Sequence, residues 1–547
     1  MSPVEVMMIR LLFVLSLLVT SVAPPAAAIG GELQVLARPG PWPVADGLIA
    51  YRDRVWFSSA VKGANHNSAD IWSYDPAQSK LQFERYLFSQ DTGAPVVHKA
   101  LLFWPHEDMR VGLGAGVISV TNDRDWQNLS VPSDDHMMHT HGATQWNGVL
   151  VAAMAGWHSA LSISKDAGRS WQVLVNDPPR DGSFHRYNHI SAIKGRLFAR
   201  HWEKTGESLA EYRNGRMQDV EGWPKDRSFS DFVRFRNALY SLVKNRDGTS
   251  RLWRIGSGAP EVVDVDIKEG LKRLLVSDGQ ALWIVTEGPS GGQLWSSPNA
   301  RAFTARHTFS GGVAHAAVAL AAGRIYLGGA GDDGKAILWG PPDPPQETRQ
   351  TPFQPMPVQR PDPDPEFPAA AQRARMQAVL ADPVTFADRG RALRQQLSEI
   401  LAQKPPIDFF APLLAAPVAD GQVATFGGRF SVPMGDIANW HLLNAMAENG
   451  EKQVPLAFLE KPWERQPNGP QKWFDNLLIA LHAVQRAQQN DRATIDILIR
   501  RLDQSGDPDW LQSQVTGTLA ALTGQKFAYD KDQWRAWWGA AQASWKP

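Results

Sequence analysis

Polar side chains that could bind a ligand or catalyse a reaction recur at a similar position in each copy of a sequence repeat. Each lies 8 to 13 residues before the first apolar residue that follows a short turn. The set comprises Asp46, His98, His141, His189, Asp231, Arg273 and His315. Imidazole titrates near neutral pH and is a common ligand of transition metals. We expect these side chains to surround one binding site, and the alternative is that they only join neighbouring strands.

The densest histidine segment, residues 136–141, contains His139 and His141. Residues two apart on a strand face the same side, which two ligands of one metal ion require. With a further histidine they could hold Zn²⁺, Mn²⁺ or another divalent ion, and the sequence leaves the cofactor unknown. The alternative is a pair of partly exposed histidines on a loop.

Alternatively, residues at these positions could form a catalytic site. His189 or Tyr187 could act as a general base, while Arg186 or Arg273 pairs with a substrate carboxylate. The chain has no glycine-rich phosphate loop, no G-x-S-x-G and no H-E-x-x-H. The sequence therefore lacks the common signatures of phosphate binding, serine hydrolysis and zinc proteolysis.

The elements that would position these residues form a repeat of about 45 residues between residues 30 and 340. Each copy has an apolar strand, a short polar turn and a second apolar strand. The first apolar residues after the turns are Val55, Val111, Leu150, Leu197, Leu239, Leu282 and Ile325. Such alternation indicates strands, and this period is typical of propeller blades. We predict a seven-bladed β-propeller over residues 29–340, with six blades as the alternative because the second repeat is irregular.

The ends of this region are expected to meet. Residues 32–38 precede the first full repeat, and the last repeat stops early, at Trp339. We expect residues 32–38 to supply the outer strand of the last blade. Closing the ring in this way removes exposed sheet edges.

One turn carries a recognisable motif. Ser164, Asp166, Gly168 and Trp171 fit the pattern S-x-D-x-G-x-[ST]-W in full. The aspartate can accept backbone N–H bonds in a tight hairpin, and glycine allows a positive φ. The segment resembles the Asp-box of the sialidase-like (BNR) β-propellers. The resemblance implies a propeller fold and a structural motif on the blade rim, away from any pocket.

Beyond the repeat the composition changes. Residues 341–368 contain 11 prolines, which predicts an extended linker. Residues 369–547 show helical periodicity, and their end resembles the closing turn and helix of bacterial HEAT-repeat-like domains. The resemblance covers roughly residues 430–547 and implies paired helices with Trp534 and Trp538 packed inward. Such arrays offer a docking surface, and the alternative is a plain bundle that braces the propeller.

The N-terminus and the composition indicate where the protein works. Arg10, a short apolar run and Ala26-Ala27-Ala28 predict a signal peptide over residues 1–28, with a membrane anchor as the alternative. The chain has no cysteine, which excludes disulfides and iron–sulfur clusters. Its net charge of zero argues against nucleic acid as a partner. We expect export to a bacterial periplasm or beyond, with no transmembrane segment in the mature chain.

Together these patterns favour an exported, non-catalytic recognition or scaffold protein. The propeller mouth would bind a glycan, an ion or an envelope partner, and the helical tail would dock or brace. The alternative is a carbohydrate-active enzyme, a polysaccharide lyase or a glycoside hydrolase, that uses His189, Tyr187 and Arg186.

Overall fold

The structure is a computed structural model. It describes residues 31–546 except for 61–68, 88, 108–115, 132–136, 157, 179–184, 204–205, 268–270, 289–290, 321–323, 343–361, 426–429, 464–474, 505–506 and 508. The predicted signal peptide and most of the predicted linker lie outside the described residues. No helix in these ranges combines the length and the apolar character needed to cross a bilayer.

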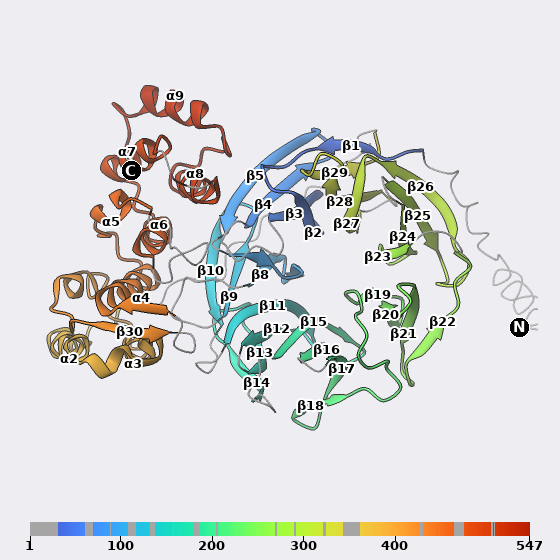
Figure 1. Ribbon diagram of the computed structural model, residues 1–547, viewed down its shortest axis with the longest axis horizontal. Helices are drawn as coiled ribbons and strands as arrows, with labels where there is room; N and C mark the ends of the chain where they lie inside the picture. The colour runs from blue at the N-terminus through green and yellow to red at the C-terminus, as the bar shows by residue number, and fades with distance from the viewer. Residues whose placement is uncertain are drawn as a thin grey trace, which may run out of the picture.

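Antiparallel sheets built from neighbouring strands form a ring that resembles a β-propeller (Figure 1). The first sheet contains β2 (Val44–Tyr51), β3 (Arg54–Ala60), β4 (Ala69–Asp75) and β5 (Lys80–Leu87). The second contains β6 (Asp91–Thr92), β7 (Val96–His98), β8 (Leu101–Glu107), β9 (Gly116–Thr121) and β10 (Trp126–Val131). In each, the first strand is innermost and the last is on the rim.

Three further sheets repeat this order around the ring. One contains β19 (Val233–Phe235), β20 (Ala238–Lys244), β21 (Ser250–Ile255) and β22 (Glu261–Val263). The next contains β23 (Leu271–Ser277), β24 (Leu282–Gly288), β25 (Gly291–Ser297) and β26 (Thr304–Ser310). The last contains β27 (Gly312–Ala319), β28 (Ile325–Gly331), β29 (Ala336–Gly340) and β1 (Gln34–Ala37).

The remaining strands of the ring form a single eight-stranded sheet. Its members are β11 (Met137–Trp146), β12 (Val149–Gly156), β13 (Ser159–Ser164), β14 (Gln172–Asp177), β15 (His185–Ile193), β16 (Arg196–Glu203), β17 (Gly206–Arg213) and β18 (Arg216–Asp219). Strand β12 runs on to pair with β15, joining Ala155 to Arg186 and Gly156 to His185. The ring therefore has five separate blades, not the seven or six predicted, because this extra pairing fuses the rest.

Ring closure follows the sequence prediction. Strand β1 pairs with β29, with Gln34 opposite Gly340 and Val35 opposite Trp339. The prediction that residues 32–38 supply the outer strand of the last sheet is thus confirmed. The pairing covers an edge of β29 that would otherwise be open.

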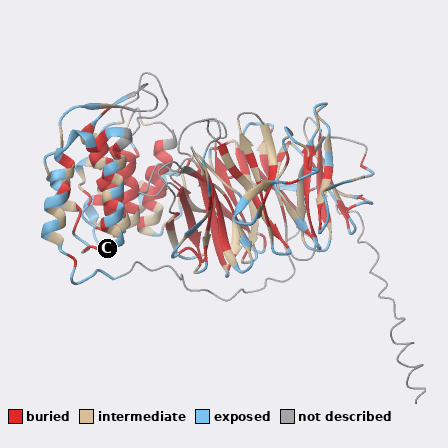
Figure 2. Cartoon of the chain, turned by 90° about the horizontal axis from the view of Figure 1, so that it is seen from below, coloured by how far each residue is buried: buried red, intermediate tan, exposed pale blue. Residues whose placement is uncertain are grey.

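Helices follow the ring and lie against one side of it (Figures 1 and 2). They are α2 (Ala369–Ala381), α3 (Ala387–Ala402), α4 (Met434–Asn449), α5 (Ala457–Glu460), α6 (Asn476–Ala487), α7 (Arg492–Arg501), α8 (Asp509–Thr523) and α9 (Lys531–Ala541). Between them lie the 3₁₀ turns η2 (Pro383–Phe386) and η3 (Ala411–Ala415) and a hairpin of β30 (Gln422–Thr425) and β31 (Phe430–Pro433). Trp534 and Trp538 are buried, as predicted, but this arrangement does not by itself identify a HEAT array.

The ring and the helices share one hydrophobic core. Buried aromatic residues of the first sheet, including Phe83 and Tyr86, cluster with Leu511 and Trp534 of the helices. Helix α8 approaches β5 so closely that a Cβ added to Gly517 would lie 2.2 Å from the Cβ of Tyr86. A glycine at this point lets the helix dock onto the strand.

Polar contacts complete this interface. Lys526 lies 2.7 Å from Glu84. The Asp70 carboxylate accepts hydrogen bonds from the Trp42 indole, at 2.9 Å, and from the hydroxyl of Tyr529. Burial raises the pKa of Asp70 well above its ordinary value. This carboxyl group thus joins residues on both sides of the interface.

Basic side chains, two buried histidines and two partly buried arginines, also gather where β8 and β5 face helix α6. Burial, followed by repulsion from Arg486, lowers the pKa of Arg85 to about 10. Burial, followed by repulsion from Arg85, lowers the pKa of His106 to about 3. For His482, burial and then Arg486, Arg85 and His106 bring the pKa well below its ordinary value. Both imidazoles are therefore neutral in the folded protein.

We predict that Gly517→Ala destabilises the protein by about 1–3 kcal/mol, because the new methyl group has no room beside Tyr86. Thermal or urea unfolding measures this change. Gly539→Ala is the matched control, since a Cβ there meets nothing within 4 Å and should stabilise α9 by up to about 1 kcal/mol. Equal effects of the two substitutions would contradict the close approach of α8 to β5.

We also predict a pH dependence from His482. The folded state keeps this imidazole neutral, whereas the unfolded state binds a proton below a pH of about 6.5. Stability is therefore retained above that pH and lost as the pH falls. His482→Gln should make this loss shallower by up to about 1.4 kcal/mol per pH unit. Urea unfolding between pH 7 and pH 5 tests this, with Leu478→Met as a control that leaves the slope unchanged.

Candidate functional site

Five of the innermost strands of the ring, β2, β11, β15, β23 and β27, carry a bulge. Extra residues interrupt the ladder, which re-aims the side chains there. The residues without a ladder partner include His141 in β11, His189 in β15, Arg273 in β23 and His315 in β27. In β2 the shift follows Asp46. The position that these residues share in the sequence repeat is thus a shared bulge.

His98 does not belong to this set. It ends β7 and pairs with Leu101 across the hairpin, so it lies at the opposite end of its strand. Its ring is buried and lies 6.3 Å from the ring of Phe103. The hairpin that leads into β8 turns at Lys99 and Ala100, so Leu101 and not Val111 is the first apolar residue after the turn. The structure therefore separates His98 from the other predicted residues.

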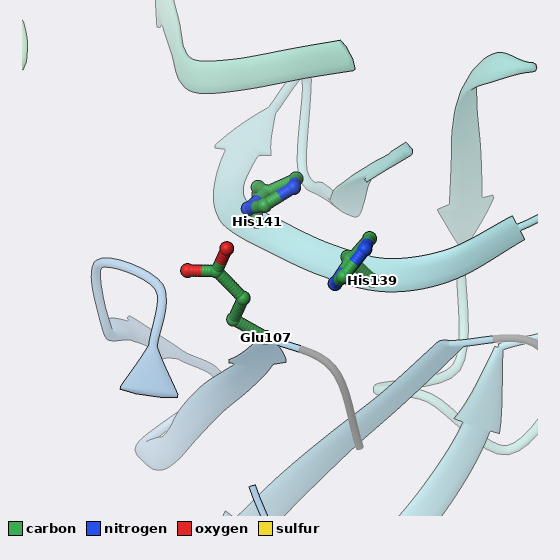
Figure 3. Close-up of side chains that lie close together, drawn as sticks. All are labelled: Glu107, His139 and His141. Carbon is green, nitrogen blue, oxygen red and sulfur yellow. The ribbon is translucent and has the colours of Figure 1, made fainter. Parts of the chain in front are cut away.

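Three side chains that could bind a metal ion meet where β8 ends and β11 begins (Figure 3). Glu107 is the last residue of β8, and His139 and His141 project from β11 toward it. The two imidazole rings stack, with centroids 5.0 Å apart. One ligand atom from each residue lies within 4.8 Å of the others. Because ligands of a tetrahedral ion with bonds of about 2.1 Å lie about 3.4 Å apart, small side-chain movements would let them share one ion.

The surroundings of this group keep His141 in its neutral form. Burial lowers the pKa of His141 well below its ordinary value, and the nearby His139, Arg186, His189 and Arg200 lower it further. The ring is therefore neutral, which is the form that binds a metal ion. Its Nε2 atom is buried and has no hydrogen-bond partner among the described residues. A buried polar atom of this kind fits a site that lacks its ligand.

Arg186 lies beside the carboxylate of this group. Its Nη1 is 3.6 Å from Oε1 of Glu107, and its guanidinium group lies 5.4 Å from the ring centroid of Trp202. This contact can orient Glu107, as partners around metal ligands commonly do. The guanidinium group also offers donors to an anionic ligand.

His189 and Asp231 meet between neighbouring sheets. Nδ1 of His189 contacts the carboxylate of Asp231, which precedes β19. His189 has a φ of 45°, in the left-handed region, as its place in a bulge requires. Arg273 and His315 lie in the bulges of β23 and β27, which Figure 1 shows across the ring from β11. The side chain of Arg273 lies outside the described residues.

Tyr187 does not share an open face with Arg186. Its hydroxyl donates to Asp177, and its buried ring lies 4.9 Å from that of His201. Side chains of a strand alternate between faces, so Arg186 points the other way, toward Glu107. The structure therefore does not assemble His189, Tyr187 and Arg186 into the predicted catalytic trio.

The motif at residues 164–171 forms a hydrogen-bonded turn between β13 and β14. Ser164 donates to Asp166 at 2.8 Å and accepts from the N–H of Gly168 at 2.7 Å. Asp166 accepts from the N–H of Ser170, and Gly168 has a φ of 92°. Trp171 packs, partly buried, against the sheet core. These contacts explain the turn without assigning the chain to the sialidase-like family.

The turn also lies apart from the three side chains that could bind a metal ion. Ser164 pairs with Leu150, near the first residue of β12, whereas His139 pairs with Ala155 near its end. The turn and these donors thus lie toward opposite ends of β12.

Glu107 is the residue that sequence reasoning missed. It follows His106 at the end of the second strand of its repeat, where Glu203 and Glu287 stand in β16 and β24. The recurrence of an acidic residue at the end of the second strand could thus have identified Glu107 as a candidate from the sequence. Only the pairing of strands shows that this end faces His139 and His141.

No protein-family model matches this chain, and no curated protein matches it. Solved structures with a similar fold include YCF48 from Cyanidioschyzon merolae, with a TM-score of 0.39 and 12% identity over 57% of this chain and 99% of that one. The β-propeller domain of the trilobed protease from Pyrococcus furiosus gives 0.38 and 10%, over 58% and 100%. The polysaccharide lyase Uly1 gives 0.37 and 9%, over 59% and 94%. The likeness extends to the β-propeller fold and assigns no activity.

Proposed function

We propose that this is an exported, non-catalytic recognition protein whose ring binds a divalent transition-metal ion through Glu107, His139 and His141. The observation that carries the proposal is the approach of these three donors to within 4.8 Å of one another. Two imidazoles and one carboxylate suit ions such as Zn²⁺ and Mn²⁺. The metal ion would be the structural centre of the ligand site.

Three protein ligands leave an open position on a four-coordinate ion. An oxygen atom of a glycan or of an envelope protein would occupy it, and Arg186 would hold an anionic group of the same ligand. The contact of His189 with Asp231 lines the same mouth from the neighbouring sheets. This arrangement supports binding, and the burial of Tyr187 makes the enzymatic alternative less well supported.

We further infer that the eight-stranded sheet represents two fused blades, so that the ring contains seven repeat units. Its halves, β11–β14 and β15–β18, each have four consecutive antiparallel strands. Each half also has its own bulged innermost strand, β11 or β15. A signal peptide over residues 1–28 and a HEAT-like helical tail over residues 369–547 complete this proposal, and the shared core supports bracing as the role of the tail.

We predict that the chelator-treated protein takes up Zn²⁺ and that His141→Ala loses one equivalent. Loss of a direct ligand should weaken binding by more than the about 10- to 100-fold that an outer partner costs. Isothermal titration and elemental analysis measure this. His307→Ala is the control, since His307 lies on the rim strand β26. Wild-type protein that binds no more Zn²⁺ than His141→Ala would refute the metal site.

A separate experiment tests the proposal that the protein is not an enzyme. Purified protein loaded with Zn²⁺ should not turn over a polyuronate or an aryl glycoside. Turnover of either substrate that disappears in His189→Ala would contradict this part of the proposal and restore the enzymatic alternative.

A further inference from the structure

A buried pair of histidines joins the innermost strand β15 to the next strand, β16. His185 is the first residue of β15, and His201 lies near the end of β16. Both are buried, with 3% and 6% of their surface exposed. Nδ1 of His185 is 3.0 Å from Nε2 of His201, which in turn is 3.4 Å from Oε1 of Glu203. The three residues each offer one ligand atom within 4.8 Å of the others.

These separations match those between ligands of one metal ion. Around an ion with bonds of about 2.1 Å, neighbouring ligand atoms lie about 3.0–3.4 Å apart, depending on the coordination number. Two facing imidazole nitrogens at such a distance share either a proton or a metal ion. Glu203 lies near the same nitrogen of His201, and its carboxylate would supply negative charge to a bound ion.

A polar pocket opens beside the pair. It has a volume of about 200 Å³ and is lined by residues that include His201, Glu203, Glu207, Asp219 and Lys225. Carboxylates outnumber the single lysine in this lining, which favours a cation. The pocket also gives solvent and a small ligand access to the open positions of a bound ion.

The surroundings hold both imidazoles in place. The Ser159 hydroxyl lies 3.1 Å from Nδ1 of His185, and the ring of Tyr187 lies 4.9 Å from that of His201. Tyr187 is itself held by the carboxylate of Asp177. These contacts restrict the two rings, and a bound ion would replace the Ser159 hydroxyl at Nδ1 of His185.

We infer that His185, His201 and Glu203 bind a second divalent transition-metal ion, which faces the pocket over β16–β18. This site shares no ligand with the group of Glu107, His139 and His141, so it goes beyond the proposed function and does not depend on it. The alternative is that the two imidazoles share a proton and bind no metal ion.

Zinc stoichiometry tests the inference on the full mature chain after chelator treatment. The wild type should bind two equivalents of Zn²⁺, and His201→Ala and His141→Ala should each bind one. The double variant should bind none. His158→Ala is the matched control, because this partly exposed histidine lies next to the site and contacts Asn176 instead. It should keep both equivalents.

The variant Glu203→Gln tests the same site in case His201→Ala does not fold. It preserves the shape of the side chain, so its circular dichroism and metal-free melting temperature should equal those of the wild type, with Zn²⁺ binding at the second site at least about 10-fold weaker. The inference is overturned if His201→Ala and Glu203→Gln bind as much Zn²⁺ as the wild type. One equivalent that only His141→Ala removes would also overturn it while leaving the proposed function intact. If the wild type binds one equivalent of Zn²⁺ that only His201→Ala removes, the second site is supported and the metal site of the proposed function is refuted.

Discussion

The bulge that five of the innermost strands carry is the constraint on which the mouth of the ring depends. In an uninterrupted ladder, side chains alternate strictly between the two faces of a sheet. The extra residues in β11 and β15 break this alternation and turn His141 and His189 out of register with their neighbours. Because the same interruption occurs in β2, β23 and β27, the polar residues there repeat with the blades.

Much of the ring could be predicted from the sequence, because alternating apolar residues and repeated turns are local signals. The closing strand and the burial of Trp534 and Trp538 followed from the same patterns. The second repeat was misread because its hairpin turns at Lys99 and Ala100, both with positive φ, where Asn or Gly would normally mark the turn. The fusion through β12 and β15 and the approach of Glu107 to His139 depend on pairing between distant residues, which no local pattern contains.

The helices are connected to the strand that carries Glu107. His106, the residue before it, lies 2.8 Å from the Ser119 hydroxyl, which donates to the side chain of Asn128 at 2.7 Å. The backbone carbonyl of Asn128 accepts from Arg486 of α6 at 3.4 Å. A chain of hydrogen bonds thus runs from the inner end of β8 to the helical region, which braces the second sheet from outside.

Ring closure by β1 also leads us to expect a late step in folding. The first strand of the ring has to wait, unpaired, until β29 has been synthesised, since these two strands close the last sheet together. Contacts between such distant segments form late, because the entropy of the intervening chain opposes them. Until then, both strands expose backbone groups that could pair with another chain. We therefore expect the nascent polypeptide to be most prone to aggregation before β1 and β29 pair.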